Sequence, residues 1–294
     1  MDLQVETGTS DRRTLDVYVE GPEGTVPLLF HNGTPSSGQL YAPFVEAASQ
    51  RGLRMLSFSR AGYGSSTRDP GRSVADVVSD VAAVLDELAA HRFYTLGWSG
   101  GGPHALACAA LLPGRLIGAA TVGGLAPYDA QGLDWMAGMG QENIAAFGAA
   151  LAGDSALRMF LEGVGPSFAT VTAEEVATRL GNLVSDVDRL AISRDSAAWL
   201  ADVFRESVRN GIWGWHDDEI GLVRPWTFDL TDINVPVAIW QGSQDRMTPF
   251  AHGEWLASHI PGVQPHLLAD HGHLSLGVDS FGVILNDLLT IAPT

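Results

Sequence analysis

The sequence of 294 residues contains no lysine, so all 17 of its basic residues are arginine. A chain without lysine has no side chain for Schiff-base catalysis and no anchor for pyridoxal phosphate. It also lacks the phosphate-binding lysine of a P-loop and the lysine of a Ser-x-x-Lys nucleophile. The absence of this one residue type therefore excludes several classes of enzyme chemistry before any motif is considered.

Cysteine is almost absent as well, because Cys108 is the only one. A single cysteine cannot form an intramolecular disulfide or a thiolate metal cluster. Cys108 lies in the run ALACAALL, which is typical of a small buried apolar residue rather than a nucleophile. None of the nine histidines has the His-x-x-x-His or carboxylate-paired spacing of a helical metal site, so we expect no metal.

Positive charge is scarce, since 34 acidic residues give a net charge of −17. Such a chain offers no basic surface for nucleic-acid phosphates and repels anionic membranes. The N-terminus, MDLQVETGTSD, lacks the basic start and apolar core of a signal peptide. The longest apolar region, 105–126, is interrupted by Pro-Gly-Arg at 113–115, which favours helix, turn and strand over a membrane span. We therefore expect a cytoplasmic protein without nucleic-acid or membrane partners.

What is present is an alternation of strand and helix patterns. Residues 73–91 place apolar side chains at helical spacing behind Ser73, a good N-cap, and residues 103–112 form a second predicted helix. Short apolar or alternating runs that end in turn residues predict strands at 14–21, 26–33, 53–60, 93–99 and 116–124. This order predicts an α/β protein with a right-handed, doubly wound, mostly parallel sheet.

The pattern changes after Gly124. Residues 125–231 lack β-branched runs, contain helical stretches and hold five of the eight tryptophans. The alternation then resumes with predicted strands at 235–240 and 263–270 and predicted helices at 249–259 and 280–289. We therefore expect a catalytic core of residues 1–124 and 232–294, interrupted by an inserted helical cap of residues 125–231.

The motif LGWSGGGPHAL places Ser99 among glycines where a predicted strand meets a predicted helix. A serine hydroxyl needs a base and oxyanion donors to act as a nucleophile. In a tight strand-turn-helix elbow, side chains two residues on either side of the serine would clash, and Gly97 and Gly101 occupy those positions. The following helix points its positive end at the developing anion, and the Gly100 N–H is one expected oxyanion donor.

The remaining groups of such a site follow other predicted strands. In HNGTPSSG, after the strand LLF, the Thr34 N–H is the expected second oxyanion donor, with Gly33 as the alternative. In WQGSQDRMTP, Asp245 occupies a turn just beyond a strand, where the acid is expected. In LLADHGHLSL, His273 is the expected base and His271 its close rival. Ser99, Asp245 and His273 together supply a nucleophile, an orienting acid and a general base.

Five motifs in this chain resemble the α/β-hydrolase superfamily, in particular its serine hydrolases with a helical cap, such as esterases, C–C hydrolases and proline iminopeptidases. The motifs occur in the family's order: HNGTP (31–35), SRAGYGSS (59–66), GWSGG (97–101), GSQD (242–245) and HGH (271–273). The resemblance implies an α/β-hydrolase fold and a triad in the order Ser, Asp, His. Serine at the nucleophile position argues for acyl transfer, because epoxide hydrolases and haloalkane dehalogenases carry aspartate there. Asn32 and Ser59 depart from the family's usual His and Asp, and neither change removes a catalytic group.

The expected substrate is a small molecule, namely a small, uncharged or weakly polar carboxylic ester, cleaved without a cofactor. Trp98, beside the nucleophile, and Trp135, Met136 and Phe147 of the predicted cap are expected to line an apolar pocket. Packing inside the cap is the alternative for each of these cap residues. The sequence leaves the oligomeric state open.

Two other functions fit the same pattern. An aminopeptidase of the proline iminopeptidase type would use acids of the cap to hold the free amine of its substrate, with candidates Glu142, Glu174, Glu175 and the acidic run 217–219. That run is otherwise expected to be a solvated face. A receptor built on the same fold would bind a small signal molecule or cleave it only slowly.

Overall fold

The computed structural model describes residues 2–7 and 12–293. Within these residues the chain forms one eight-stranded sheet, in the order β1-β2-β4-β3-β5-β6-β7-β8. The pairs β1–β2 and β2–β4 are antiparallel, and every other pair is parallel, as the sequence predicts for most of the sheet. The strands are β1 (Asp2–Glu6), β2 (Thr14–Glu20), β3 (Val26–His31), β4 (Leu53–Phe58), β5 (Phe93–Trp98), β6 (Leu116–Val122), β7 (Val237–Gly242) and β8 (Gln264–Leu268).

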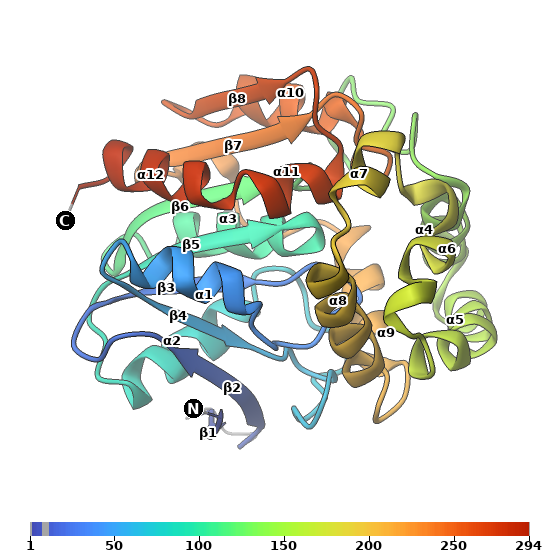
Figure 1. Cartoon of the computed structure of the whole chain (residues 1–294), viewed down its shortest axis with the longest axis horizontal. Helices are drawn as coiled ribbons and strands as arrows, with labels where there is room; N and C mark the ends of the chain where they lie inside the picture. The colour runs from blue at the N-terminus through green and yellow to red at the C-terminus, as the bar shows by residue number, and fades with distance from the viewer. Residues whose placement is uncertain (1, 8–11, 294) are drawn as a thin grey trace.

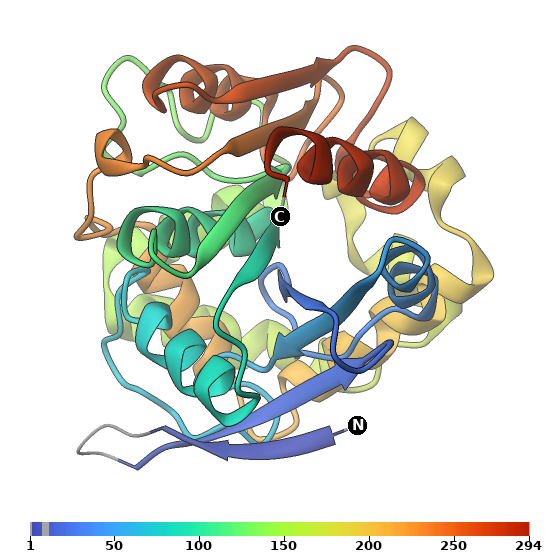
Figure 2. The same cartoon turned by 90° about the vertical axis from the view of Figure 1, so that its left-hand side faces the viewer.

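Helices cover both faces of this sheet (Figures 1 and 2). The central strands β5, β6 and β7 are buried along their whole length, which explains their unbroken apolar sequences. One face packs on α1 (Ala42–Ser49), α11 (His273–Asp279) and α12 (Phe281–Ile291). The other packs on α2 (Val77–Glu87), α3 (Gly102–Leu111) and α10 (Phe250–His259). The doubly wound architecture predicted from the sequence is confirmed.

The segment between β6 and β7 is mainly helical and forms a group at one end of the sheet, beyond the carboxyl ends of the parallel strands (Figure 1). Its helices are α4 (Gln141–Ala152), α5 (Asp154–Ala169), α6 (Val176–Arg179), α7 (Asp186–Ala191), α8 (Arg194–Ser207) and α9 (Trp213–Leu222), with short 3₁₀ turns that include η2 (Ala173–Glu175). Ligands of open α/β sheets bind at the carboxyl ends of the strands. The helical group therefore stands over the place where a site is expected.

The start of α2 differs from the expectation. The sequence predicts Ser73 as the N-cap, but the helix begins at Val77. The backbone N–H and the hydroxyl of Ser73 donate to Asp76 Oδ2 at 2.6 and 2.8 Å. These bonds form a turn of residues 73–76, so Ser73 does not cap the first turn of α2.

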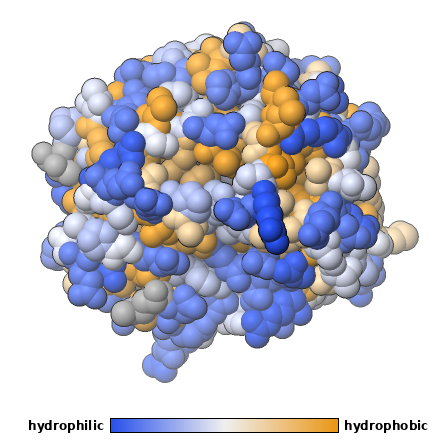
Figure 3. Space-filling model, in the orientation of Figure 1, coloured by the Kyte–Doolittle hydropathy of each residue, from blue (hydrophilic) through white to orange (hydrophobic). Residues whose placement is uncertain are grey.

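Hydrophilic and hydrophobic side chains are interspersed over the face shown in Figure 3. In the described part of the chain no single helix is long and apolar enough to cross a membrane. The helices α11 and α12, bent by 70° to each other, meet that test only as a pair.

Candidate active site

Ser99 lies at the sharp turn between β5 and α3, in the centre of the sheet. Its φ of +57° is unusual for a residue with a side chain, and such strain concentrates at functional sites. A Cβ at Gly97 would collide with the Gly101 carbonyl, and a Cβ at Gly101 would collide with the His31 carbonyl. The two glycines that the sequence motif places around Ser99 are therefore required by the close approach of three backbone segments.

His273 and Asp245 form a buried pair beside this turn. The His273 Nδ1 lies 2.7 Å from Asp245 Oδ2, and the side chains are 2% and 0% exposed. The other oxygen, Asp245 Oδ1, accepts hydrogen bonds from the backbone N–H groups of Met247 and Thr248, both at 2.8 Å. Gly123 leaves room for the pair, because a Cβ there would lie only 2.8 Å from the His273 ring. The Gln241 amide also donates to Oδ2 at 3.1 Å, so both oxygens of the carboxylate are held while Oδ2 orients the imidazole.

The surroundings of His273 favour its protonated form. Burial alone would lower the pKa of His273, but the charge and hydrogen bond of Asp245, with a contribution from Asp188, outweigh burial and raise that pKa. The rival His271 has no carboxylate partner of this kind; its Nε2 lies 3.5 Å from the Ser280 hydroxyl, and it does not line the cavity described below. Of the two histidines, the structure brings His273 to Asp245.

Asp188 on α7 holds the helix that carries His273. Asp188 is fully buried and accepts hydrogen bonds at 3.1, 2.9 and 2.9 Å from the backbone N–H groups of His273, Leu274 and Ser275, the first residues of α11. These N–H groups have no partner within a helix, and a carboxylate also interacts favourably with the helix dipole. Sequence analysis missed Asp188, because its partners lie 85 to 87 residues further along the chain.

The expected oxyanion donors lie next to the elbow. A Cβ built at Gly100 would lie 3.4 Å from the Thr34 nitrogen and 3.0 Å from its Cβ, so the two residues face each other. A Cβ built at Gly33 would lie 3.2 Å from the Ser99 Cβ. The loop after β3 therefore brings Gly33 next to Ser99 and the Thr34 nitrogen next to Gly100.

Arg60, from the motif SRAGYGSS, binds the backbone of this loop. Its guanidinium donates to the carbonyls of Asn32 and Gly33 at 2.6 and 2.8 Å. The Thr34 hydroxyl in turn donates to Asp218 Oδ2 at 2.8 Å. These hydrogen bonds hold the carbonyls of Asn32 and Gly33 and the hydroxyl of Thr34. They therefore fix the conformation of the loop that carries the candidate donors.

Asp218 is the centre of a buried charge cluster and is only 1% exposed. It forms ion pairs with Arg60 and Arg72, both at 2.5 Å, and accepts a hydrogen bond from the Tyr63 hydroxyl at 2.9 Å. Burial alone would raise the pKa of Asp218, but the charges of Arg60 and Arg72 outweigh it and hold that pKa well below its ordinary range.

The acidic run 217–219 is therefore not the solvated face that we expected. All three residues of the run lie on α9 and are buried. Asp217 accepts two hydrogen bonds from Arg68, at 2.7 and 2.8 Å. Asp218 is the centre of the buried charge cluster with Arg60 and Arg72. Glu219 lines the cavity over Ser99. The physical reason is that arginines distant in sequence neutralise the first two acids.

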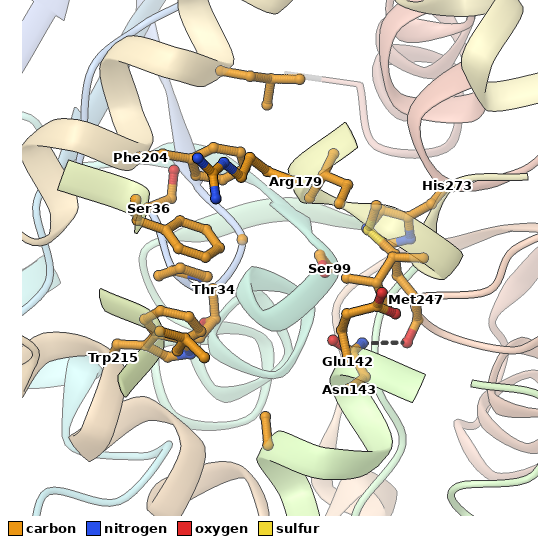
Figure 4. Close-up of a pocket in the computed structure, with 18 of the residues that line it drawn as sticks. Thr34, Ser36, Ser99, Glu142, Asn143, Arg179, Phe204, Trp215, Met247 and His273 are labelled. Atoms are coloured by element: carbon orange, nitrogen blue, oxygen red, sulfur yellow. Dashed lines mark hydrogen bonds between the residues drawn. The ribbon is translucent and has the colours of Figure 1, made fainter. Parts of the chain in front are cut away.

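Ser99, His273 and Trp98 line a cavity of about 710 Å³, a size that suits a small organic ligand. Figure 4 shows His273, Glu142, Asn143 and Met247 on one side of Ser99, and Trp215 and Phe204 on the other. Most of the apolar wall comes from helices between β6 and β7: Phe160, Val164, Phe168, Leu180, Leu183, Trp199, Leu200, Phe204 and Trp215.

The predicted pocket residues divide into two groups. Trp98 lines the cavity and stacks on His273, with ring centroids 5.9 Å apart. Trp135, Met136 and Phe147 do not line it and pack with the core under α2, α3 and α10. The Trp135 indole donates to the Ala126 carbonyl at 2.8 Å and packs edge-on against Phe147 at 4.6 Å.

The structure also assigns positions to the remaining acids of interest. Glu142, Glu174, Glu175 and Glu219 all line the cavity, together with Arg179. Within the described residues no group of three or more His, Cys, Asp or Glu side chains is arranged to hold a metal ion. Cys108 is buried, as expected, and burial raises the pKa of its thiol.

Comparisons with known proteins agree with this architecture. A family model described as the alpha/beta hydrolase fold matches residues 26–280. An uncharacterized hydrolase of Bacillus subtilis (strain 168), YcgS, is 25% identical over 284 residues, 93% of each chain. A non-heme chloroperoxidase of Streptomyces lividans is 27% identical over 249 residues, 83% of each chain. The solved structure of an esterase from Exiguobacterium antarcticum superposes with a TM-score of 0.71 at 20% identity, over 100% of both chains. The chain therefore belongs to the α/β-hydrolase-fold family and is a hydrolase of that family.

Proposed function

We propose that the protein is a serine hydrolase that cleaves a small, uncharged or weakly polar carboxylic ester through an acyl-enzyme. The observation that supports this most is the buried Asp245–His273 pair, because His273 lines the same cavity as Ser99, which lies on a strained turn. A nucleophile, a base and an acid that orients the base are the three groups that acyl transfer requires.

In the proposed mechanism, His273 accepts the Ser99 proton while the Ser99 oxygen attacks the ester carbonyl. The oxyanion of the tetrahedral intermediate accepts hydrogen bonds from the Gly100 N–H and from the N–H of Thr34 or Gly33. The carbon–oxygen bond to the alcohol then breaks, and the alcohol leaves with the proton from His273. A water molecule, deprotonated by His273, attacks the acyl-enzyme. The bond to the Ser99 oxygen then breaks, His273 returns the proton to that oxygen, and the acid is released. Asp245 stays ionised and stabilises the imidazolium in both steps.

We further propose that the helical segment 125–231 acts as a cap. Its helices supply most of the apolar wall of the cavity, and an apolar wall excludes water and favours substrates with little charge. This part of the proposal accounts for the choice of an uncharged ester.

Labelling with a fluorophosphonate tests the nucleophile directly. We expect the adduct on Ser99 after peptide mapping, no labelling in Ser99→Ala, and hydrolysis of short alkyl esters by the wild type only. An adduct on another serine would contradict the proposal. Labelling of Ser99 without turnover of any ester or amide would favour the receptor alternative.

The aminopeptidase remains a second candidate, because four carboxyl groups line the cavity: Glu142, Glu174, Glu175 and Glu219. Such acids would attract the ammonium group of an N-terminal proline. Comparing an alkyl ester with a prolyl amide separates the two functions. The ester hydrolase prefers the ester at every pH, whereas the aminopeptidase prefers the amide and loses activity when the substrate amine loses its proton.

A further inference from the structure

Glu219 has one carboxyl oxygen without a partner in a buried position on the cavity wall. The residue lies on α9 and is 5% exposed. Its Oε1 accepts a hydrogen bond from the Trp215 indole at 2.9 Å. Its Oε2 is buried and has no hydrogen-bond partner. A buried polar atom left unpaired is destabilising, and the residue that carries this one lines the cavity.

The surroundings of this carboxyl are apolar. Phe168 packs edge-on against Trp215 at 4.9 Å and against Phe204 at 5.3 Å, and all three line the cavity. Trp215 and Phe204 lie across the cavity from His273 and Met247 (Figure 4). The apolar wall around Glu219 therefore lies away from the base, on the side that the remote part of a substrate would reach.

The charged groups near Glu219 do not compensate a negative charge on it. Its neighbour Asp218 carries a negative charge. The nearby Arg60 and Arg72 are already paired with Asp218. From α5, Asp154 lies 3.2 Å from His216, and Arg158 pairs with Glu162. The other ionisable groups that line the cavity are Glu142 of α4, Glu174 and Glu175 of η2, Arg179 of α6 and His273 of α11.

The balance of these effects keeps the proton on the carboxyl at neutral pH. Burial raises the pKa of Glu219 to about 8, the charge of Asp218 adds to this effect, and the Trp215 hydrogen bond opposes it. A protonated carboxyl has one O–H donor. Since Oε1 already accepts from Trp215, the geometry leaves Oε2 as the hydroxyl oxygen.

We propose that Glu219 is a specificity-determining hydrogen-bond donor, whose Oε2–H binds an acceptor oxygen carried by the ester substrate away from its reacting carbonyl. The inference rests on the proposed ester hydrolase function and deepens it. The substrate class is an ester with an apolar body and a second ketone, ether or hydroxyl oxygen. A site that pairs a buried donor with such an oxygen discriminates against the analogue that lacks it, because the donor is then left unpaired.

The test compares matched esters. Ethyl levulinate and ethyl isocaproate form a matched pair, in which a methyl group takes the place of the ketone oxygen. Homologues of this pair are lengthened by single methylenes and carry the ketone in the acyl or the alcohol part. They place the ketone at different positions in the cavity. We expect the wild type to favour the best ketone ester over its partner by about 10-fold in kcat/KM. That preference falls as the pH rises through about 8, because the carboxylate cannot donate. The alkyl ester shows no such fall.

Variants at this position separate donation from charge. Glu219→Gln keeps a donor and should keep the preference for the ketone, but without its fall at high pH. Glu219→Met keeps the chain length without a donor and should abolish the preference, measured as the ratio of kcat/KM for the two matched esters. Glu162→Gln, which changes an exposed acid on α5, is the control and should behave as the wild type.

Infrared spectroscopy of Ser99→Ala tests binding without turnover. We expect a protonated carboxyl band at neutral pH that is missing when Glu219→Gln is added, and that shifts when the best ketone ester binds. No ketone preference in any homologue overturns the inference, and so does a carboxylate band at neutral pH that is lost when Glu219→Gln is added. A preference for the cationic ethyl ester of γ-butyrobetaine would also overturn the inference if it grows with pH and is lost in Glu219→Gln. Such a preference would indicate that Glu219 binds a cation as a carboxylate. If the wild type cleaves no alkyl ester, the proposed function itself fails.

Discussion

Asp218 and Glu219 are consecutive acids on one helix, and their environments move their pKa values in opposite directions. Two arginines hold Asp218 ionised, whereas the apolar wall raises the pKa of Glu219 to about 8. His273 shows the same dependence on neighbours, because Asp245 reverses the effect of burial. At the scale of residues, the protonation state of these side chains depends on the groups that each one faces more than on its residue type.

The raised pKa of His273 predicts the pH dependence of ester cleavage. His273 must be neutral to accept the Ser99 proton, so activity is lost as the pH falls through its pKa. With that pKa above the ordinary 6.5, kcat/KM for an alkyl ester should rise through an inflection above pH 6.5 and then stay level. His271→Ala should keep this inflection, whereas His273→Ala should lose activity by about 10⁴-fold or more. An inflection below 6.5, or reversed effects of the two variants, would contradict the assignment of the base.

At the scale of elements, α7 and α11 are joined through one carboxylate. Asp188 binds the N-terminus of a helix that begins with His273, the proposed base, although α7 and α11 are separated by β7, α10 and β8 in the chain. The position of His273 therefore depends on the helical segment as well as on the loop after β8.

Asp188→Asn tests this positioning role. The amide can offer only one acceptor oxygen to the three backbone donors, so we expect kcat for an alkyl ester to fall by about 10-fold with little change in KM. Because the charge of Asp188 raises the pKa of His273, the inflection should also move to lower pH, which a purely structural loss would not cause. Asp186→Asn, an exposed acid on the same helix, is the matched control. An unchanged inflection in Asp188→Asn would contradict the role.

The elements differ in how far the sequence could predict them. The strands and the helices that cover them carry local signals, namely apolar runs that end in turn residues and apolar side chains at helical spacing. The elbow could be predicted because Gly97 and Gly101 record a steric requirement in the sequence itself. The burial of Asp217 and Asp218 on α9 could not, since their partners Arg60, Arg68 and Arg72 lie about 150 residues earlier. Residue type alone predicts Trp135 and Phe147 in the pocket, whereas α4 turns Glu142 and Ala146 toward it instead.

At the scale of the molecule, the sheet and the helical segment meet in the charge cluster around Asp218. Arg60 and Arg72 come from the loops after β4, and Asp218 comes from α9. The cluster supports the loop of the candidate oxyanion donors and at the same time fastens the helices over the sheet.

Asp218→Asn should therefore be strongly destabilising. Removing the charge leaves two buried guanidinium groups without their counter-ion, and we expect the free energy of unfolding to fall by about 3 to 5 kcal/mol. Urea unfolding followed by tryptophan fluorescence measures the change. Glu162→Gln, which breaks an exposed pair with Arg158, should lower it by less than about 1 kcal/mol. Equal effects of the two substitutions would show that the cluster adds nothing beyond a surface pair.

The hydrogen bonds of Asp188 to α11 limit how freely the parts of this protein can be exchanged. A cap that only covered the cavity could be replaced by a cap from a relative to alter substrate choice, or trimmed away to open the site. A replacement for the segment 125–231 must also supply a carboxylate at the start of α11, or His273, the proposed base, loses its anchor. When segments are exchanged between relatives, in evolution or in the laboratory, Asp188 and the N-terminus of α11 must therefore come from the same parent.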